Sequence, residues 1–144
     1  MSIPEPNRGE GELAVNTKCR QLVVYTLKIL ENEKWFPQGQ KAFITKLQDC
    51  VIEIAALCWE ANNIKVGEDK ERYNRRITLQ DQAAEKCNRM CMLIEIAKPL
   101  FALKSKRVRY WIKLTSETRS MIRAWHDKDV QRLKPKEQAV LHRM

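Results

Sequence analysis

Apolar residues recur at alternating intervals of three and four positions along most of the chain. One such run comprises Ile44, Leu47, Val51, Ile54, Cys58 and Ala61. On an α-helix this spacing places the apolar side chains on one face, which is typical of helices that pack in a bundle. The run therefore predicts a helix over residues 40–64 with its seam toward a shared core.

Three other segments show the same kind of pattern. The predicted helix 69–103 carries Ala83, Cys87, Met90, Ile94, Ala97 and Phe101, and the predicted helix 106–126 carries Val108, Trp111, Thr115, Thr118, Ile122 and Trp125. The predicted helix 17–32 carries Leu22, Val23, Thr26, Ile29 and Leu30. Pro37, Gly39 and Gly67 mark breaks between helices, and Pro99 predicts a kink or an early end near Lys98.

Four amphipathic helices with short connections favour one architecture. We expect an all-α fold, an antiparallel up-down four-helix bundle over residues 17–127, with a polar N-terminal extension (1–16) and a basic C-terminal tail (128–144). Gly and Pro are scarce, at 4 and 5 residues, which favours helices over a loop-rich fold. No segment has the apolar length that crosses a bilayer, and the N-terminus lacks signal-peptide features, so we expect no membrane partner and a cytoplasmic location.

Two of the predicted helices carry apolar residues outside their seams. They are Ile52 and Trp59 in the second helix and Ile112, Leu114 and Met121 in the fourth. A single four-helix core needs only a narrow apolar face from each helix, and monomers rarely expose large apolar patches. We therefore predict that these residues form the interface of a homo-oligomer. The alternative is a generously packed core.

Positive charge is concentrated in one short region of the chain. The net charge is +9, and residues 104–125 contain seven basic residues and one acidic residue. Charge this localised favours a polyanionic partner, nucleic acid first, over a solvated helix face, which is the alternative for any charged stretch. The predicted phosphate contacts are Lys104, Lys106, Arg107, Arg109, Lys113, Arg119 and Arg123, with Arg72, Arg75 and Arg76 as secondary candidates.

Two aromatic residues interrupt this basic region, in the sequence KSKRVRYWIK (104–113). On a helix, Trp111 falls on the side opposite Lys106, Arg109 and Lys113, so it is expected in the core. Tyr110 lies beside the basic stripe and is the aromatic residue here that could stack on a base.

Residues for catalysis or metal binding are sparse. The two histidines, His126 and His142, have no neighbouring Cys or carboxylate pattern, and no Glu-x-x-His pair is present. Cys87 and Cys91 lie one helical turn apart and could share a metal, but their position on or beside a seam favours buried structural thiols. We expect no cofactor, no metal and no enzymatic activity. The alternative is a helical enzyme that works through Arg and carboxylates inside the bundle.

Two segments carry a family resemblance, DCVIEIAALCWEANNI (49–64) and KRVRYWIKLTSETRSMIRAW (106–125). They resemble the four-helix-bundle family that includes the accessory variability determinant proteins of diversity-generating retroelements and proteins encoded in bacterial ribosomal RNA intervening sequences. Glu60-Ala61-Asn62 is similar to the family's Glu-Ala-Asn, and the Tyr-Trp entry and Ile-Arg-Ala-Trp exit of the last helix are similar to the family's, although Ala124 stands where many relatives carry Gly. The resemblance covers about residues 17–127.

This resemblance implies a basic homopentamer, a barrel of five bundles, that binds nucleic acid and a reverse transcriptase. In that family the accessory protein supports template-primed cDNA synthesis during mutagenic retrohoming and is not itself catalytic. The implied partners are RNA, cDNA and the reverse transcriptase in a bacterial or phage-infected bacterial cell. Two alternatives stay open: a helical interaction module that docks an acidic protein, and a ribosomal RNA intervening-sequence bundle without a reverse transcriptase.

Overall fold

The structure, a computed structural model, is all-helical. It describes the backbone of residues 10–143 and the side chains of residues 14–134. The helices are α1 (Glu10–Leu30), α2 (Lys41–Asn63), α3 (Lys70–Leu100) and α4 (Ser105–Arg143), with a short 3₁₀ helix, η1 (Gln38–Gln40), before α2. The described backbone contains no strand. The prediction of four helices is confirmed.

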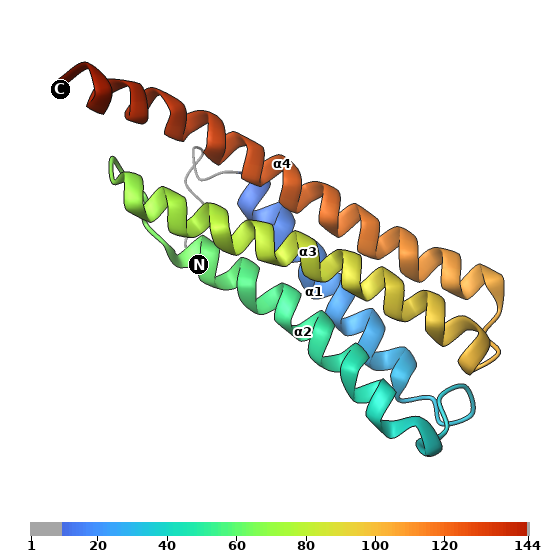
Figure 1. Cartoon of the computed structure of the whole chain (residues 1–144). Coiled ribbons are helices and arrows are strands. Elements are labelled where there is room, and N and C mark those ends of the chain that lie inside the picture. Colours follow the sequence, from blue (N-terminus) through green and yellow to red (C-terminus); the bar gives the residue numbers. More distant parts are fainter. Residues whose placement is uncertain (1–9, 144) are drawn as a thin grey trace, which may run out of the picture.

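Each helix packs against two others. α1 contacts α2 and α4, and α3 also contacts α2 and α4, so the four helices surround one core. Figure 1 shows the α1–α2 and α3–α4 connections at one end of this four-helix bundle and the α2–α3 connection at the other. We call the end that contains residues 31–40 and 101–104 the basic end. Within the described chain, no helix combines the length and the hydrophobicity needed to cross a membrane.

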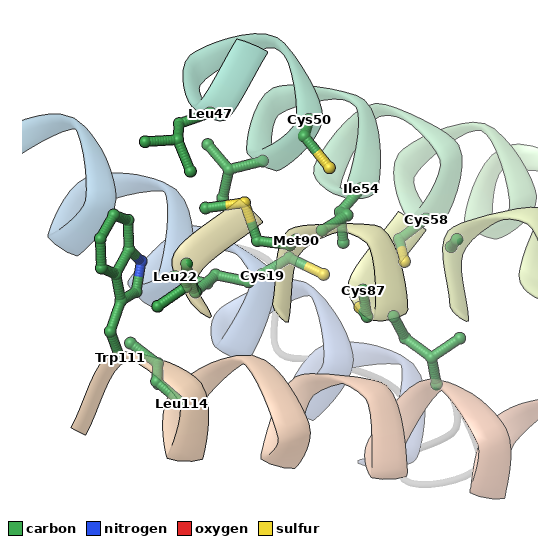
Figure 2. Packing of buried hydrophobic residues seen from close by; sticks show 14 of the residues in the cluster. Cys19, Leu22, Leu47, Cys50, Ile54, Cys58, Cys87, Met90, Trp111 and Leu114 are labelled. Carbon is green, nitrogen blue, oxygen red and sulfur yellow. The ribbon is translucent and has the colours of Figure 1, made fainter. Parts of the chain in front are cut away.

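The predicted seams form the core of the bundle. All six seam residues of α4 are buried, and the seams of α2 and α3 are buried except for Ile44 and Phe101, which are half-buried. Figure 2 shows side chains from all four helices, among them Leu22, Ile54 and Met90, meeting in the interior. Of the α1 seam, Val23 is half-buried and the other four residues are buried. Apolar spacing therefore identified most of the predicted seam positions as core positions.

Trp111 is fully buried, as its position opposite the basic stripe predicted. Its indole N–H donates a hydrogen bond to Thr26 Oγ1 on α1 at 3.0 Å. Phe36, from the α1–α2 connection, meets its ring edge-on with the centroids 6.3 Å apart. The hydroxyls of Thr115 and Thr118 donate to backbone carbonyls one turn earlier in α4. The polar atoms that these residues bring into the core are therefore paired.

All five cysteines are free thiols; Cys91 is half-buried and Cys19, Cys50, Cys58 and Cys87 are buried. Hydrogen bonding to the Cys19 thiol, together with burial, raises the pKa of Cys58, and burial raises the pKa of Cys87. These two thiols are therefore protonated at neutral pH, whereas the thiolate is the form that reacts and binds metals. The described side chains contain no group of three or more residues suited to hold a metal ion.

The start of α3 follows the predicted break. The Asp69 carboxylate accepts hydrogen bonds from the backbone N–H groups of Glu71 at 2.9 Å and Arg72 at 3.4 Å, which caps the helix. Gly67, in the connection before the cap, has a φ of +49°, a left-handed conformation that glycine adopts at little cost. Local sequence thus fixes both the turn and the first residue of the helix.

The end of α3 is fixed by backbone hydrogen bonds. α3 contains Pro99 in its last turn and ends at Leu100, close to the early end predicted near Lys98. The Leu103 N–H donates to the Lys98 carbonyl at 2.9 Å, and the Ala102 N–H donates to the Pro99 carbonyl at 3.4 Å. Ala102 has a φ of 51°, the left-handed conformation that closes many helices. This turn sets the direction in which α4 begins.

α1 is longer than predicted. It begins at Glu10 rather than near residue 17, and Val15, which the prediction assigned to the N-terminal extension, is 1% exposed. Val15 continues the apolar face of α1 beyond Cys19, so the helix gains core contacts before its predicted start. Residues 1–9 of the predicted extension lie outside the described residues.

α4 is also longer than predicted. It continues to Arg143 rather than ending near His126. Asp129 and Leu133, which the prediction assigned to a tail, are 0% and 7% exposed. The prediction of a tail rested on the polar and basic composition of this region. In the structure Asp129 occupies a core position with charged and polar partners, and the helix continues.

Candidate nucleic-acid interface

Four of the predicted phosphate contacts lie together around the start of α4. They are Lys104, Lys106, Arg109 and Lys113, all exposed, and we call them the cationic patch. Lys113, whose side chain is 74% exposed, lies 4.0 Å from Glu117. The other three form no ion pair with any residue whose side chain the structure describes. An anionic partner would therefore find three of these four cations without an acidic neighbour among the described side chains.

The position of the cationic patch strengthens its positive potential. The first turn of α4 contains no acidic residue, and a helix N-terminus carries unpaired backbone N–H groups and the positive end of the helix dipole. A cation at this end is unfavourable by a few tenths to about 1 kcal/mol. A helix face that only contacts solvent gains no stability from cations at this end. A phosphate-binding site gains a stronger positive potential.

Arg107 has a structural role that the sequence did not indicate. Its side chain is half-buried, and its guanidinium carbon lies 3.6 Å from the centroid of the Trp35 ring. At this distance the guanidinium stacks on the indole and attaches the α1–α2 connection to α4. Arg107 therefore contributes to the shape of the basic end, and only part of its guanidinium faces solvent.

Arg119 and Arg123 point toward α3 rather than extending the cationic patch. Arg123 Nη1 lies 3.7 Å from Asp81 Oδ1 on α3, and Arg119 is half-buried. The helical arc placed Arg123 with the patch, but its long side chain folds onto an acidic partner that the sequence pattern does not reveal. The predicted stripe of seven cations is thus a patch of four near the basic end, with Arg107 stacked on Trp35. Of the two arginines further along, Arg123 faces Asp81 and Arg119 is half-buried.

Arg76 does not belong to the interface, contrary to the prediction. It is 4% exposed, its Nε donates a hydrogen bond to Asp129 Oδ2 at 2.8 Å, and its guanidinium carbon lies 5.1 Å from the Trp125 ring centroid. It is buried because it lies on the core face of α3. Arg72 and Arg75 are exposed, but the start of α3 is at the end of the bundle opposite the basic end.

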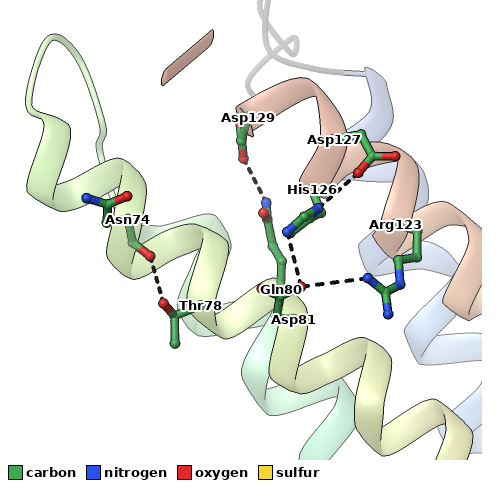
Figure 3. A network of polar contacts seen from close by, with 8 residues as sticks. All are labelled: Asn74, Thr78, Gln80, Asp81, Arg123, His126, Asp127 and Asp129. Carbon is green, nitrogen blue, oxygen red and sulfur yellow. Dashed lines mark hydrogen bonds and ion pairs between the residues drawn. The ribbon is translucent and has the colours of Figure 1, made fainter. Parts of the chain in front are cut away.

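A buried polar network surrounds Asp129. Its Oδ2 accepts hydrogen bonds from Arg76 Nε at 2.8 Å and from Gln80 Nε2 at 2.7 Å; Figure 3 shows Gln80 reaching Asp129 across the two helices. Beside it, His126 Nε2 lies 3.1 Å from Asp81 Oδ1. Buried charges are tolerated when they are paired and hydrogen-bonded in this way. The network ties the first half of α3 to the second half of α4.

Sequence reasoning missed this network although its signal was present. The spacing of three and four extends backwards from Ala83 through Gln80, Arg76 and Tyr73, and forwards from Trp125 through Asp129 and Leu133. Counting only apolar residues ended both seams too early. In this bundle the oppositely charged residues Arg76 and Asp129 occupy seam positions of two helices and form a buried pair.

The residues predicted as an oligomer interface differ in exposure. On α2, Trp59 is 61% exposed and Ile52 is 47% exposed. On α4, Ile112 and Met121 are half-buried against the core. Leu114 is 6% exposed, so its assignment to the surface is wrong. It is covered because α4 packs on α1 as well as on α3, and Leu114 lies on the α1 side.

Three further apolar residues form an exposed stripe that was missed. Met92, Ile96 and Leu100 on α3 are 47%, 45% and 40% exposed. Their spacing of four residues places them on one face of the helix. The stripe occupies the C-terminal half of α3 and so lies toward the basic end. The spacing of the stripe is visible in the sequence, but the neighbouring seam of α3 has a similar spacing and was the one assigned to the core.

A groove lies between α1 and α4 beside the cationic patch. Its volume is about 510 Å³, and it is lined by Arg20, Gln21, Val24, Tyr25, Tyr110 and Leu114. Tyr25 and Tyr110 meet edge to face, with their ring centroids 4.9 Å apart and an interplanar angle of 61°. Tyr110 is 53% exposed. Burial raises the pKa of Tyr25, so the Tyr25 phenol is uncharged at neutral pH.

The chain matches no protein-family model, no curated protein and no solved structure. The resemblance to accessory variability determinant proteins therefore depends on the segments 49–64 and 106–125 and stays a prediction. In the structure these segments belong to α2 with the residue that follows it and to the first half of α4.

Proposed function

We propose that the chain is a non-enzymatic, nucleic-acid-binding accessory protein. In this proposal it associates with the reverse transcriptase and the template RNA of a diversity-generating retroelement and supports cDNA synthesis in mutagenic retrohoming. The observation that carries nucleic-acid binding is the cationic patch, whose exposed and largely uncompensated cations lie between residues 104 and 113, at the start of α4 and in the turns that follow. The link to a retroelement is supported by the sequence resemblance.

The cationic patch would act on the phosphate backbone. Lysine and arginine bind phosphates without reading bases, so the expected affinity is sensitive to salt and only weakly dependent on sequence. Such a surface holds a template or its cDNA near a polymerase without fixing the template sequence. That property suits a process in which the copied sequence changes.

We also propose an antiparallel up-down bundle that assembles as a homo-oligomer, a pentameric barrel, in the cytoplasm of a bacterial or phage-infected cell. The exposed Ile52 and Trp59 on α2 support self-association, since large apolar side chains are costly to leave in water. Assembly would repeat the cationic patch on every protomer. Several weak phosphate contacts on one particle then add in avidity.

Neutralising the cationic patch tests the function. The variant Lys106→Ala/Arg109→Ala/Lys113→Ala is expected to bind single-stranded RNA about 50-fold more weakly than the wild type near 0.15 M salt, because three phosphate contacts are lost. With four contacts, wild-type affinity should fall about 50-fold between roughly 50 and 200 mM salt, and the variant should fall only a few-fold. Fluorescence anisotropy with a labelled RNA measures both.

A matched control separates local from total charge. The variant Lys46→Ala/Lys65→Ala/Arg89→Ala removes the same charge from exposed positions outside the cationic patch. It should keep most of the RNA affinity. Equal losses in the two variants, or a wild-type affinity that hardly changes with salt, would contradict a phosphate site at the start of α4.

A second candidate function is docking of an acidic protein. The exposed stripe of Met92, Ile96 and Leu100 favours it, because aliphatic side chains contribute to protein interfaces and little to phosphate binding. RNA affinity that survives neutralisation of the patch, together with lost capture of a protein partner, would support this candidate. A coding sequence with no neighbouring reverse transcriptase gene would instead favour the ribosomal RNA intervening-sequence alternative.

Self-association has its own test. Native mass measurement at micromolar concentration should give a multiple of the chain mass, five in the pentameric barrel, and Trp59→Asp should give the monomer. Trp59 is 61% exposed, so the substitution should change the free energy of unfolding of the protomer by no more than about 0.5 kcal/mol. Glu60→Ala, at the adjacent exposed position, is the control and should keep the assembly. A wild-type monomer would overturn the oligomer proposal.

A further inference from the structure

The groove between α1 and α4 has the size and lining of a binding site. Its volume of about 510 Å³ lies within the range of roughly 300–1,000 Å³ typical of ligand pockets. Val24, Leu114 and the two tyrosines supply apolar and aromatic surface, and Arg20 supplies a cation on the α1 side. The groove therefore suits a flat, partly apolar group that is attached to negative charge.

Tyr110 provides a stacking surface in this groove. Tyr25 contacts it edge to face, which limits the motion of the ring, and 53% of Tyr110 remains exposed. A restrained aromatic ring loses little conformational entropy when a ligand stacks on it. Every nucleobase has a π-face that can stack on such a ring, whatever its sequence.

Two residues of the cationic patch flank this ring. Lys106 is four residues before Tyr110 and Lys113 is three residues after it, so both are its neighbours on the surface of α4. Arg109 directly precedes it in the sequence. A base that enters the groove would therefore bring its flanking phosphates next to cations on both sides.

Charge identifies the occupant of the groove. A second copy of this chain, with a net charge of +9, would bring like charge toward Arg20, Lys106 and Lys113 if it docked here, whereas the proposed self-association uses Ile52 and Trp59 on α2. A nucleotide strand brings the opposite charge together with a planar apolar group. In a duplex both faces of each base are covered by stacking, so an aromatic side chain reaches bases chiefly in single strands.

We propose that the α1–α4 groove binds an unpaired base of a single-stranded nucleic acid. Tyr110 stacks on the base, and Lys106, Lys113 and Arg20 bind the adjoining phosphates. This inference rests on the proposed nucleic-acid binding and adds a preference for single strands over duplexes, which the cationic patch alone does not provide.

Tyr110→Ala in the full-length protein tests the groove. Its affinity for a single-stranded oligouridine should fall about 5- to 150-fold, the range for loss of one stacked base. Its affinity for an RNA duplex of equal length, and the salt dependence of single-strand binding, should stay unchanged because no phosphate contact is lost. Tyr110→Phe keeps the ring and should retain binding.

The outcomes separate the two proposals. Wild-type protein that binds neither RNA overturns both the proposed function and this inference. Wild-type protein that binds both RNAs with Tyr110→Ala harmless, or equally harmful to both, overturns the groove as a base site and leaves the cationic patch in place. A Tyr110→Ala variant that keeps single-strand affinity but loses self-association would show that a second copy occupies the groove.

Discussion

Replacing Asp129 by alanine is expected to lower the free energy of unfolding by about 3–5 kcal/mol, because the substitution removes the Asp129 carboxylate from its buried ion pair with the Arg76 guanidinium. Arg76 is 4% exposed and cannot recover full hydration where it lies. Gln80 loses its acceptor in the same step, since its Nε2 donates to the same Oδ2 atom. Urea unfolding followed by circular dichroism measures the change.

Two comparisons make this prediction specific. Asp127→Ala removes a carboxylate two residues earlier whose side chain is 71% exposed, and it should change stability by no more than about 0.5 kcal/mol. The double variant Arg76→Ala/Asp129→Ala should lose less than the sum of the single losses, because each single substitution already removes the interaction between the two residues. A loss for Asp129→Ala no larger than that of Asp127→Ala would show that α4 does not pack beyond His126.

Trp111→Ala is expected to cost about 3–5 kcal/mol in the free energy of unfolding, as for other large aromatic residues removed from a packed core. Trp111 is 0% exposed, and its ring fills the space between α1, α4 and the Phe36 loop. The substitution also leaves the Thr26 hydroxyl without its donor. Thermal and urea unfolding both report the loss.

The neighbouring aromatic residue is the natural control. Tyr110→Ala should cost no more than about 1.5 kcal/mol, the value of one edge-to-face aromatic pair, because half of its ring already faces water. The cost of Trp111→Phe in the free energy of unfolding should lie between the costs of Trp111→Ala and Tyr110→Ala, since it keeps an aromatic ring but loses the indole N–H and part of the volume. Equal costs at positions 110 and 111 would contradict the assignment of one ring to the surface and the other to the core.

Spacing predicted the core well because an apolar side chain at a seam position is most stable when it is buried between the helices. The seams of α2, α3 and α4 are buried as expected, including Trp111 inside a basic segment. Spacing failed where burial depends on a partner from another helix. Taken singly, Arg76 and Asp129 are charged residues expected at the surface. Their pairing is what allows both to be buried in the core.

The candidate site was predicted only in part, because partners elsewhere in the chain decide which cations stay unpaired. Lys104, Lys106 and Arg109 pair with no acidic residue among the described side chains, and Lys113 lies 4.0 Å from Glu117 one turn later in α4. Arg107 and Arg123 carry the same charge but reach Trp35 and Asp81 instead. A long side chain can contact residues that lie far away in the sequence, and helix periodicity does not reveal those contacts.

The turn at Ala102 bears on the order in which the bundle assembles. Only residues 101–104 separate α3 from α4, and a loop this short closes with little loss of chain entropy. Contacts between neighbours in sequence also form faster than distant ones. We therefore expect α3 and α4 to pair early, and α1, which must find α4 across the length of the chain, to dock late. The groove beside Tyr110 lies between α1 and α4, so we expect it to form last during folding and to open first during unfolding.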